Sequence, residues 1–168
     1  RWFVVRENRT ARGMTALLRS EITHLKTIQD ELERLATIDV LTELANRRHF
    51  IDCAGRLLAR CHGEGAPAAL LMFDIDRFKW TEDLVARWGG EEFVVLLPRL
   101  AMAPAVEVAQ RLRRAIAGTL VRTGQADFGF TVSIGLVACG TTDGLESLVN
   151  RADAALYEAK LRGRDQVV

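Results

Sequence analysis

The stretch DIDRFKWTEDLVARWGGEEF, residues 74–93, places carboxylates beside apolar runs. The run that leads into it, ALLMFDI, has no polar alternation and predicts a strand buried on both faces. The run LVARWGGEEFVVLLP predicts two strands joined by a Gly-Gly turn. Asp74 and Asp76 therefore end one strand, and Glu91 and Glu92 lie at the tip of a hairpin. Because buried charge is costly without a partner, this region is the candidate functional site.

The link between these strands is short. Eight residues separate Ile75 from Leu84, whereas a crossover between parallel strands needs a dozen or more, usually as a helix. The sequence leaves two alternatives open. Either the two strands pair antiparallel through a loose hairpin, or a segment between Lys79 and Trp80 is missing, as a disordered loop or as a true deletion.

The rest of the chain predicts further helices and strands around one sheet. Asp39 and Thr42 are capping residues that predict a helix from there to about Arg60. Helices are also predicted over 101–120 and 144–163, with a buried strand between them over 128–139. The order helix, strand, hairpin, helix, strand, helix indicates an α/β or α+β sandwich with a central sheet.

Residues 11–35 carry a heptad pattern in which seven of eight seam positions are apolar, the exception being Glu21. This pattern predicts a coiled coil that pairs two parallel chains, and a lone amphipathic helix packed on its own domain is the alternative. We therefore expect an N-terminal signalling helix or coiled coil over residues 1–36 and a catalytic domain over 37–168.

The amino-acid composition limits the classes of protein to which this chain can belong. The 168 residues are 49% hydrophobic with a net charge of +1, which fits a globular core and gives no bulk attraction to a nucleic acid polymer. No apolar run approaches the roughly 20 residues of a membrane-spanning helix. Three widely spaced cysteines indicate reduced thiols. We expect a cytoplasmic location, at the face of the inner membrane if the full-length protein carries an anchor.

The acidic residues indicate a metal site for phosphate chemistry. Carboxylates from a strand end and a hairpin tip can converge, and they repel unless they are protonated or bridged by a cation. Oxygen ligands without nearby His or Cys suit Mg²⁺ or Mn²⁺. Solvated loop charges are the alternative. The Gly-Gly pair argues for a phosphate ligand, because glycine lets backbone lie where a Cβ would clash.

Five motifs in series resemble the GGDEF family, the diguanylate cyclases. They are DVLTELANRR (39–48), LLMFDIDRFK (70–79), DLVARWGGEEF (83–93), TVSIGLVA (131–138) and ADAALYEAKLRGRDQV (152–167). The resemblance covers 37–168 and implies a palm-like domain with a central antiparallel or mixed sheet flanked by helices, preceded by a long N-terminal helix. It also implies an enzyme that condenses two GTP into cyclic di-GMP and releases two pyrophosphates across a dimer.

The resemblance assigns roles to individual residues. It implies catalytic roles for Glu91, the usual candidate for the base, and for Glu92. It implies two Mg²⁺ or Mn²⁺ ions per active site, held by Asp74, the Ile75 carbonyl and Glu91. Binding of the GTP substrate is implied for Phe78, Lys79, Gly89, Gly90, Lys160 and Arg164. Lys160 and Arg164 are four residues apart near the end of the predicted helix, so they can point the same way. Cations there also complement a helix dipole.

The sequence departs from the family in two places. Family members carry roughly two dozen residues between Lys79 and Trp80, enough for a crossover helix, and that segment supplies the Asn and Asp that bind guanine. At the product-inhibition site Asp83 is present, but Trp80 stands where the family has Arg. Arg111 is either a second inhibitory arginine or a surface charge.

Two alternatives to an active cyclase remain open from the sequence. One is a degenerate GGDEF module that binds nucleotide or mediates dimerisation without turnover. The other is a different nucleotidyl cyclase with the same core. The expected partners are GTP, the cyclic di-GMP product, a second copy bound through the N-terminal helix, and an upstream sensor or membrane domain.

Overall fold

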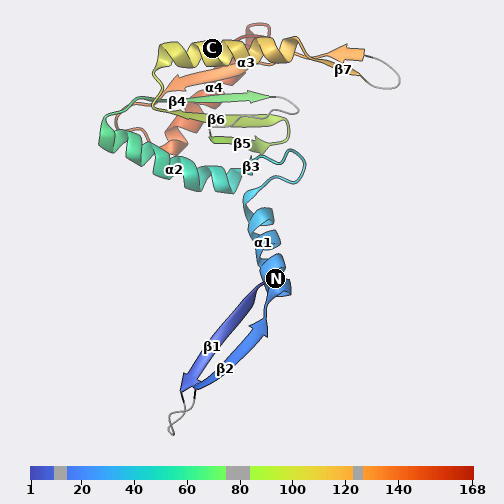
Figure 1. Ribbon diagram of the computed structural model, residues 1–168. Coiled ribbons are helices and arrows are strands. Elements are labelled where there is room, and N and C mark those ends of the chain that lie inside the picture. Colours follow the sequence, from blue (N-terminus) through green and yellow to red (C-terminus); the bar gives the residue numbers. More distant parts are fainter. Residues whose placement is uncertain (10–14, 75–83, 123–126) are drawn as a thin grey trace. The chain divides into compact units, whose positions relative to one another are not determined.

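The computed structural model describes residues 1–9, 15–74, 84–122 and 127–168 (Figure 1). The chain divides into two compact units, Arg1–Thr37 and Ile38–Val168. No helix within the described ranges is both long enough and apolar enough to cross a membrane.

The first unit is a hairpin followed by a helix. Strands β1 (Phe3–Arg9) and β2 (Thr15–Glu21) pair antiparallel, and α1 (Thr23–Thr37) follows. The helix predicted from residue 11 is therefore wrong over 15–21, where pairing with β1 satisfies the backbone hydrogen bonds. The second half of the heptad lies on α1, which has no buried residue. Its apolar positions are exposed, and they are Leu25, Ile28, Leu32 and Leu35.

The second unit is built on a five-stranded mixed sheet in the order β3-β5-β6-β4-β9. The β3–β5 pair is parallel and the other pairs are antiparallel. The strands of this sheet are β3 (Ala45–Asn46), β4 (Ala68–Asp74), β5 (Leu84–Gly89), β6 (Glu92–Pro98) and β9 (Ile134–Ala138). A small separate sheet pairs β7 (Leu120–Arg122) with β8 (Asp127–Gly129). The predicted α/β fold with a mixed sheet flanked by helices is confirmed.

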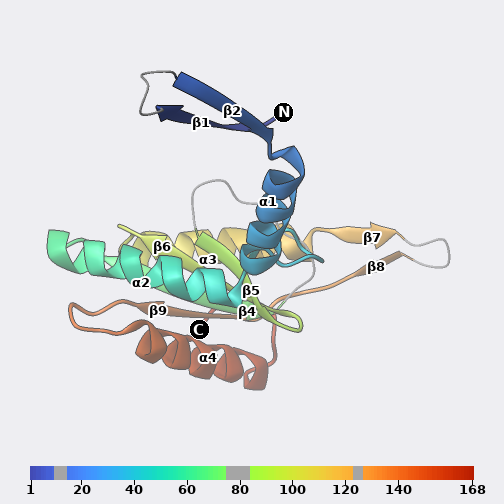
Figure 2. The same ribbon diagram turned by 90° about the horizontal axis from the view of Figure 1, so that it is seen from below.

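Helices cover both faces of this sheet (Figures 1 and 2). Helix α3 (Met102–Ala117) packs on one face, whereas α2 (Arg47–Glu64) and α4 (Leu145–Leu161) pack on the other. Strand β4 sends Leu71 and Phe73 toward α3 and Leu70 and Met72 toward α2 and α4. Burial on both faces explains why the sequence of β4 shows no polar alternation.

The topology decides one alternative for the short link. Strands β4 and β5 both pair antiparallel with β6, which lies between them. They therefore run in the same direction and do not form the loose hairpin, so that alternative is wrong. A connection between two strands of the same direction has to return along the sheet, which an ordinary α/β unit achieves with a helix. Residues 75–83 lie outside the described part of the chain.

Two predicted boundaries need correction. Helix α2 begins at Arg47 instead of near Asp39, and Asn46 caps it by accepting a hydrogen bond from the His49 amide. The carboxylate of Asp39 instead accepts hydrogen bonds from the amides of Leu41 and Thr42 in the turn before it. The strand predicted over 128–139 is shorter, because Asp127–Gly129 pairs with β7 and only Ile134–Ala138 joins the main sheet.

Helix α4 lies unusually close to β9 (Figure 2). A Cβ added to Gly135 on β9 would lie 2.1 Å from the Ala152 carbonyl oxygen and 2.3 Å from the Leu156 nitrogen. Only glycine allows this approach, because the atoms in the way belong to the helix backbone. Gly135 therefore fixes the position of α4 and of the residues at its C-terminal end.

Candidate functional site

Strand pairing brings the predicted carboxylates together at one end of the sheet. Asp74, the last residue of β4, lies directly opposite Glu92, the first residue of β6. Glu91 precedes Glu92 in the β5–β6 turn, where Gly90 has a positive φ of 55°. The structure thus places Asp74, Glu91 and Glu92 at one end of the sheet, although Asp74 comes from an element separated from the other two in the sequence.

The turn is open beside both signature glycines. A Cβ added to Gly89 or to Gly90 would meet no atom within 4 Å. Gly90 needs its positive φ, but within the described residues neither crowding nor a positive φ requires glycine at position 89. The open space leaves room for a ligand to approach the backbone, as the sequence predicts for phosphate.

An arginine holds this turn in place. Arg87 donates from Nε to the Gly90 carbonyl oxygen at 2.9 Å, and its Nη1 lies 3.1 Å from Asp39 Oδ2. Burial alone would raise the pKa of the Asp39 carboxyl. Hydrogen bonds from the Thr42 hydroxyl and amide and from Arg87 outweigh burial, so the pKa of Asp39 lies below its ordinary value. Asp39 thus ties the segment that follows α1 to the turn that carries Glu91.

Lys160 contacts the predicted metal ligand directly. Its Nζ lies 3.1 Å from Asp74 Oδ2, and both side chains are about two-thirds buried or more. The sequence predicts Lys160 at the phosphates and Asp74 at the metal ions, and the structure joins the two residues. Lys160 is in the last turn of α4, so the close packing of α4 on β9 positions this pair.

Arg164 does not lie on the helix with Lys160. Helix α4 ends at Leu161, and the chain then turns through three positive φ angles, 112° at Gly163, 65° at Arg164 and 47° at Asp165. The Arg164 amide donates to the Ala159 carbonyl at 3.0 Å. Its side chain is exposed and forms no ion pair with another described residue. Arg164 therefore lies beyond the helix that carries Lys160, and the turn determines its position.

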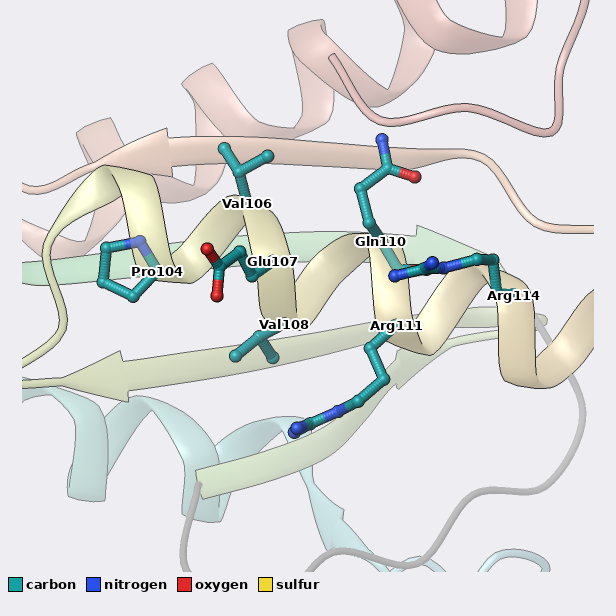
Figure 3. Close-up of a pocket in the computed structure, with 7 residues that line it drawn as sticks. All are labelled: Pro104, Val106, Glu107, Val108, Gln110, Arg111 and Arg114. Carbon is teal, nitrogen blue, oxygen red and sulfur yellow. The ribbon is translucent and has the colours of Figure 1, made fainter.

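The remaining predicted residues fall in two groups. Arg111 lies on α3 and lines an open cavity of about 560 Å³ (Figure 3). The residues around this cavity are Pro104, Val106, Glu107, Val108, Gln110, Arg111 and Arg114. The other group lies outside the described residues, so the structure does not place its members, which are Ile75, Phe78, Lys79, Trp80 and Asp83.

The donor set fits a hard divalent cation only with help from a substrate. Within the described ranges, no three His, Cys, Asp or Glu side chains gather closely enough to hold a metal ion. Mg²⁺ in phosphate-transfer sites is commonly held by one or two carboxylates together with the phosphates of the substrate. Asp74 and Glu91 match that requirement, since they are oxygen donors beside an open turn.

Comparison with known proteins decides the family. The family model described as "Diguanylate cyclase, GGDEF domain" matches residues 36–84 and 80–166. The chain belongs to the GGDEF domain family. The GGEEF sequence of residues 89–93 is its form of the signature.

Relatives and solved structures agree with this assignment. Response regulator PleD of Caulobacter vibrioides is 34% identical over 189 residues, covering 95% of this chain and 42% of PleD. Diguanylate cyclase DgcM of Escherichia coli is 33% identical over 174 residues, covering 88% of this chain and 42% of DgcM. The chain therefore spans less than half the length of each. The coiled coil and GGDEF domain of DgcB from Caulobacter crescentus, solved with c-di-GMP, has a TM-score of 0.79 at 27% identity, covering 88% of this chain and 92% of that one.

The alignments also locate a difference from the relatives. The PleD match extends over 189 residues, more than the 168 residues of this whole chain, so PleD carries residues that have no counterpart here. The family model matches in two pieces that meet at residues 80–84. Both findings agree with a segment absent between β4 and β5.

Two residues that organise the site were not predicted from the sequence. Arg87 bonds Asp39, 48 positions away, and Arg113 bonds Asp165, 52 positions away. Such distant ion pairs leave no periodic pattern in one sequence. The only local signal is weak, namely that Arg87 lies within the DLVARWGGEEF motif.

Proposed function

We propose that this chain is a diguanylate cyclase domain that joins two GTP molecules into cyclic di-GMP with release of two pyrophosphates. One observation carries the proposal: in a GGDEF-family chain, Asp74 lies directly opposite Glu92 and beside the open turn that holds Glu91. DgcM, which is similar over most of this chain, is named a diguanylate cyclase, and this supports the same reaction class.

The carboxylates serve the reacting groups. Asp74 and Glu91, with the carbonyl of Ile75, would hold two Mg²⁺ or Mn²⁺ ions at the triphosphate. When bound, such ions lower the pKa of the attacking 3′-hydroxyl and stabilise the charge of the departing pyrophosphate. Glu91 accepts the proton of that hydroxyl, and Glu92 keeps a second negative charge beside it. Gly89 and Gly90 let the backbone lie against the phosphates.

The cations bind the leaving group. Lys160 already lies 3.1 Å from Asp74, so its ammonium is next to the place where the metal ions and the phosphates meet. Arg164 offers an exposed guanidinium that can bind phosphate with two donors. Lys160 and Arg164 together neutralise the β and γ phosphates, and Phe78 and Lys79 add donors from the segment after Asp74.

Turnover requires two chains, since each domain holds one GTP. The exposed apolar stripe on α1 (Leu25, Ile28, Leu32 and Leu35) provides a surface for pairing with a second copy. Pairing raises the effective concentration of one site near the other. An upstream sensor domain would set the relative orientation of the pair, and the domain would act in the cytoplasm.

A second candidate is a degenerate GGDEF module that binds nucleotide without turnover. The absent segment between β4 and β5 favours it, because buried contacts to the base supply much of the discrimination between purines. The observation that favours turnover is the intact set of Asp74, Glu91 and Lys160 at one end of the sheet.

Incubation of the purified protein with GTP and Mg²⁺ separates the two candidates. Cyclic di-GMP from the wild type and none from a Glu91→Gln variant supports the cyclase. The matched control is Glu146→Gln, the same chemical change at an exposed position in the first turn of α4, which should retain activity. Nucleotide binding without product in the wild type supports the degenerate module and contradicts the cyclase.

A further inference from the structure

The turn after α4 adopts a conformation that its own residues disfavour. Gly163, Arg164 and Asp165 all have positive φ angles. Glycine adopts such angles freely, but residues with a Cβ do so rarely and need surrounding contacts to hold them. Two such residues stand in succession here, and one of them is Arg164.

Contacts with α3 supply the restraint. Arg113 Nη1 donates to Asp165 Oδ1 at 2.6 Å and to the Asp165 carbonyl oxygen at 3.2 Å. Arg113 is itself oriented from Nε by Gln110 Oε1 at 3.2 Å. One guanidinium therefore binds both the side chain and the backbone of the residue that follows Arg164.

The chain on either side of the turn is also anchored. The Arg164 amide donates to the Ala159 carbonyl at 3.0 Å, and the Ile134 amide donates to the Gln166 carbonyl at 2.9 Å. These bonds fix where the turn begins and ends. The Gln166 side chain adds a bond to the Ala159 carbonyl at 3.0 Å. Among the described residues, the bonds to Asp165 itself come from Arg113, so Arg113 is the contact that holds the middle of the turn.

We propose that Arg113 is a positioning residue that holds Arg164 toward the triphosphate by fixing the left-handed turn. This inference rests on the proposed function for the role of Arg164. Arg113 reaches the site from the face of the sheet opposite α4, so it links the two helical layers at the point where the phosphates bind.

The contact contributes more to positioning than to stability. Asp165 is 41% exposed, and ion pairs of exposed groups add little to the free energy of unfolding. The turn, by contrast, determines the direction of Arg164, which is more exposed than Lys160 or Arg113. We therefore expect loss of the pair to weaken phosphate binding while the melting temperature changes little.

The test compares three variants of the full chain. Arg113→Met removes the guanidinium and keeps much of the apolar stem, and Asp165→Asn weakens the pair from its more exposed end. Arg162→Met is the control, because Arg162 is nearby and, among the described residues, its side chain bonds Glu158 of α4 alone. The two measurements are the affinity for inorganic tripolyphosphate with Mg²⁺ and the hydrogen exchange rate of the Arg164 amide.

We expect Arg113→Met to weaken tripolyphosphate binding about tenfold, because only part of the population then keeps Arg164 in place. Asp165→Asn should act in the same direction, and Arg162→Met should leave binding near the wild-type value. The Arg164 amide should exchange faster in the first two variants. In an Arg164→Ala background, Arg113→Met should cause no further loss.

Unchanged affinity and unchanged exchange in Arg113→Met would overturn the inference. An equal loss of affinity in the Arg164→Ala background would also overturn it, because Arg113 would then act without Arg164. If the wild type fails to bind tripolyphosphate, the proposed phosphate-binding role of Arg164 is refuted. Faster exchange at Arg164 in Arg113→Met would in that case still support the positioning of the turn.

Discussion

Two turns flank Asp74, and each is held by an arginine that is paired with an aspartate. In the β5–β6 turn, Arg87 bonds the Gly90 carbonyl and pairs with Asp39. In the turn after α4, Arg113 bonds the Asp165 carbonyl and pairs with its carboxylate. In the first turn only Gly90 has a positive φ, whereas in the second Arg164 and Asp165 share that conformation with Gly163.

The difference indicates a separate role for each of the two turns. The first turn is easy to form, because glycine takes the left-handed position at little cost, and it presents the carboxylate of Glu91, the proposed base. The second turn forces residues with side chains into that region and so depends more on its arginine. We infer that the first turn carries the chemistry and the second turn tunes phosphate binding.

The largest expected effect separates these two roles kinetically. Glu91→Gln should lower kcat on the order of a hundredfold or more, because it alters both a proposed metal ligand and the proposed base. Arg164→Ala should instead raise KM for GTP, with a smaller change in kcat. Steady-state measurement of cyclic di-GMP formation checks both. A mainly KM effect in Glu91→Gln would break the division between the turns.

Substitution at Gly135 should displace the second turn while the first stays intact. In Gly135→Ala the new Cβ meets the Ala152 carbonyl at 2.1 Å, so α4 has to shift and the free energy of unfolding should fall by about 2–4 kcal/mol. The control is Gly55→Ala on α2, where a Cβ meets no atom within 4 Å and helix propensity should add about 0.5–1 kcal/mol. Urea denaturation measures both values, and equal values would contradict the close packing of α4 on β9.

A pair of alanine substitutions tests the backbone of the turns directly. Gly90 at φ 55° lies where an L-residue can sit, whereas Gly163 at φ 112° lies outside that region. We expect Gly90→Ala to cost about 1 kcal/mol and Gly163→Ala about 2 kcal/mol of unfolding free energy. Chemical denaturation with matched buffers provides the comparison. A larger cost at Gly90 would reverse our ranking of the two turns.

The smallest expected effect concerns the pH dependence of the first turn. The pKa of Asp39 is lowered in the folded protein from 3.8, so its contribution to stability is present above that value and is lost as the pH falls through the lower folded pKa. Asp39→Asn should cost about 1 kcal/mol at neutral pH, and the gap to the wild type should close in acid. Thermal denaturation between pH 7 and about pH 2.5 measures this. Asp52→Asn, the same chemical change at an exposed position on α2, is the matched control.

The sequence predicts the parts of this fold that local pattern encodes. The unbroken apolar run of β4, the Gly-Gly hairpin and helices α3 and α4 appear close to where their residues indicate, because burial and turn chemistry act within each segment. The gathering of Asp74, Glu91 and Glu92 also follows from strand ends and turn tips. The family resemblance, which the comparison confirms, supplied their proposed roles.

Other features depend on contacts between distant residues. Residues 15–21, in the first half of the heptad, pair with β1 as a strand, and apolar spacing alone cannot reveal that partner. Arg164 leaves the helix because Gly163 follows its last turn, although a four-residue spacing also fits a helix. The pairs of Arg87 with Asp39 and of Arg113 with Asp165 join segments 48 and 52 positions apart, so one sequence contains no pattern for them.

The most direct test is a crystal structure of the chain with Mn²⁺ and a non-hydrolysable GTP analogue, read from the anomalous signal of the manganese. We expect an anomalous peak bonded to carboxylate oxygens of both Asp74 and Glu91, with the triphosphate against Gly89 and Gly90. A peak bonded to neither carboxylate, or the two carboxylates too far apart to share one ion, would contradict the account.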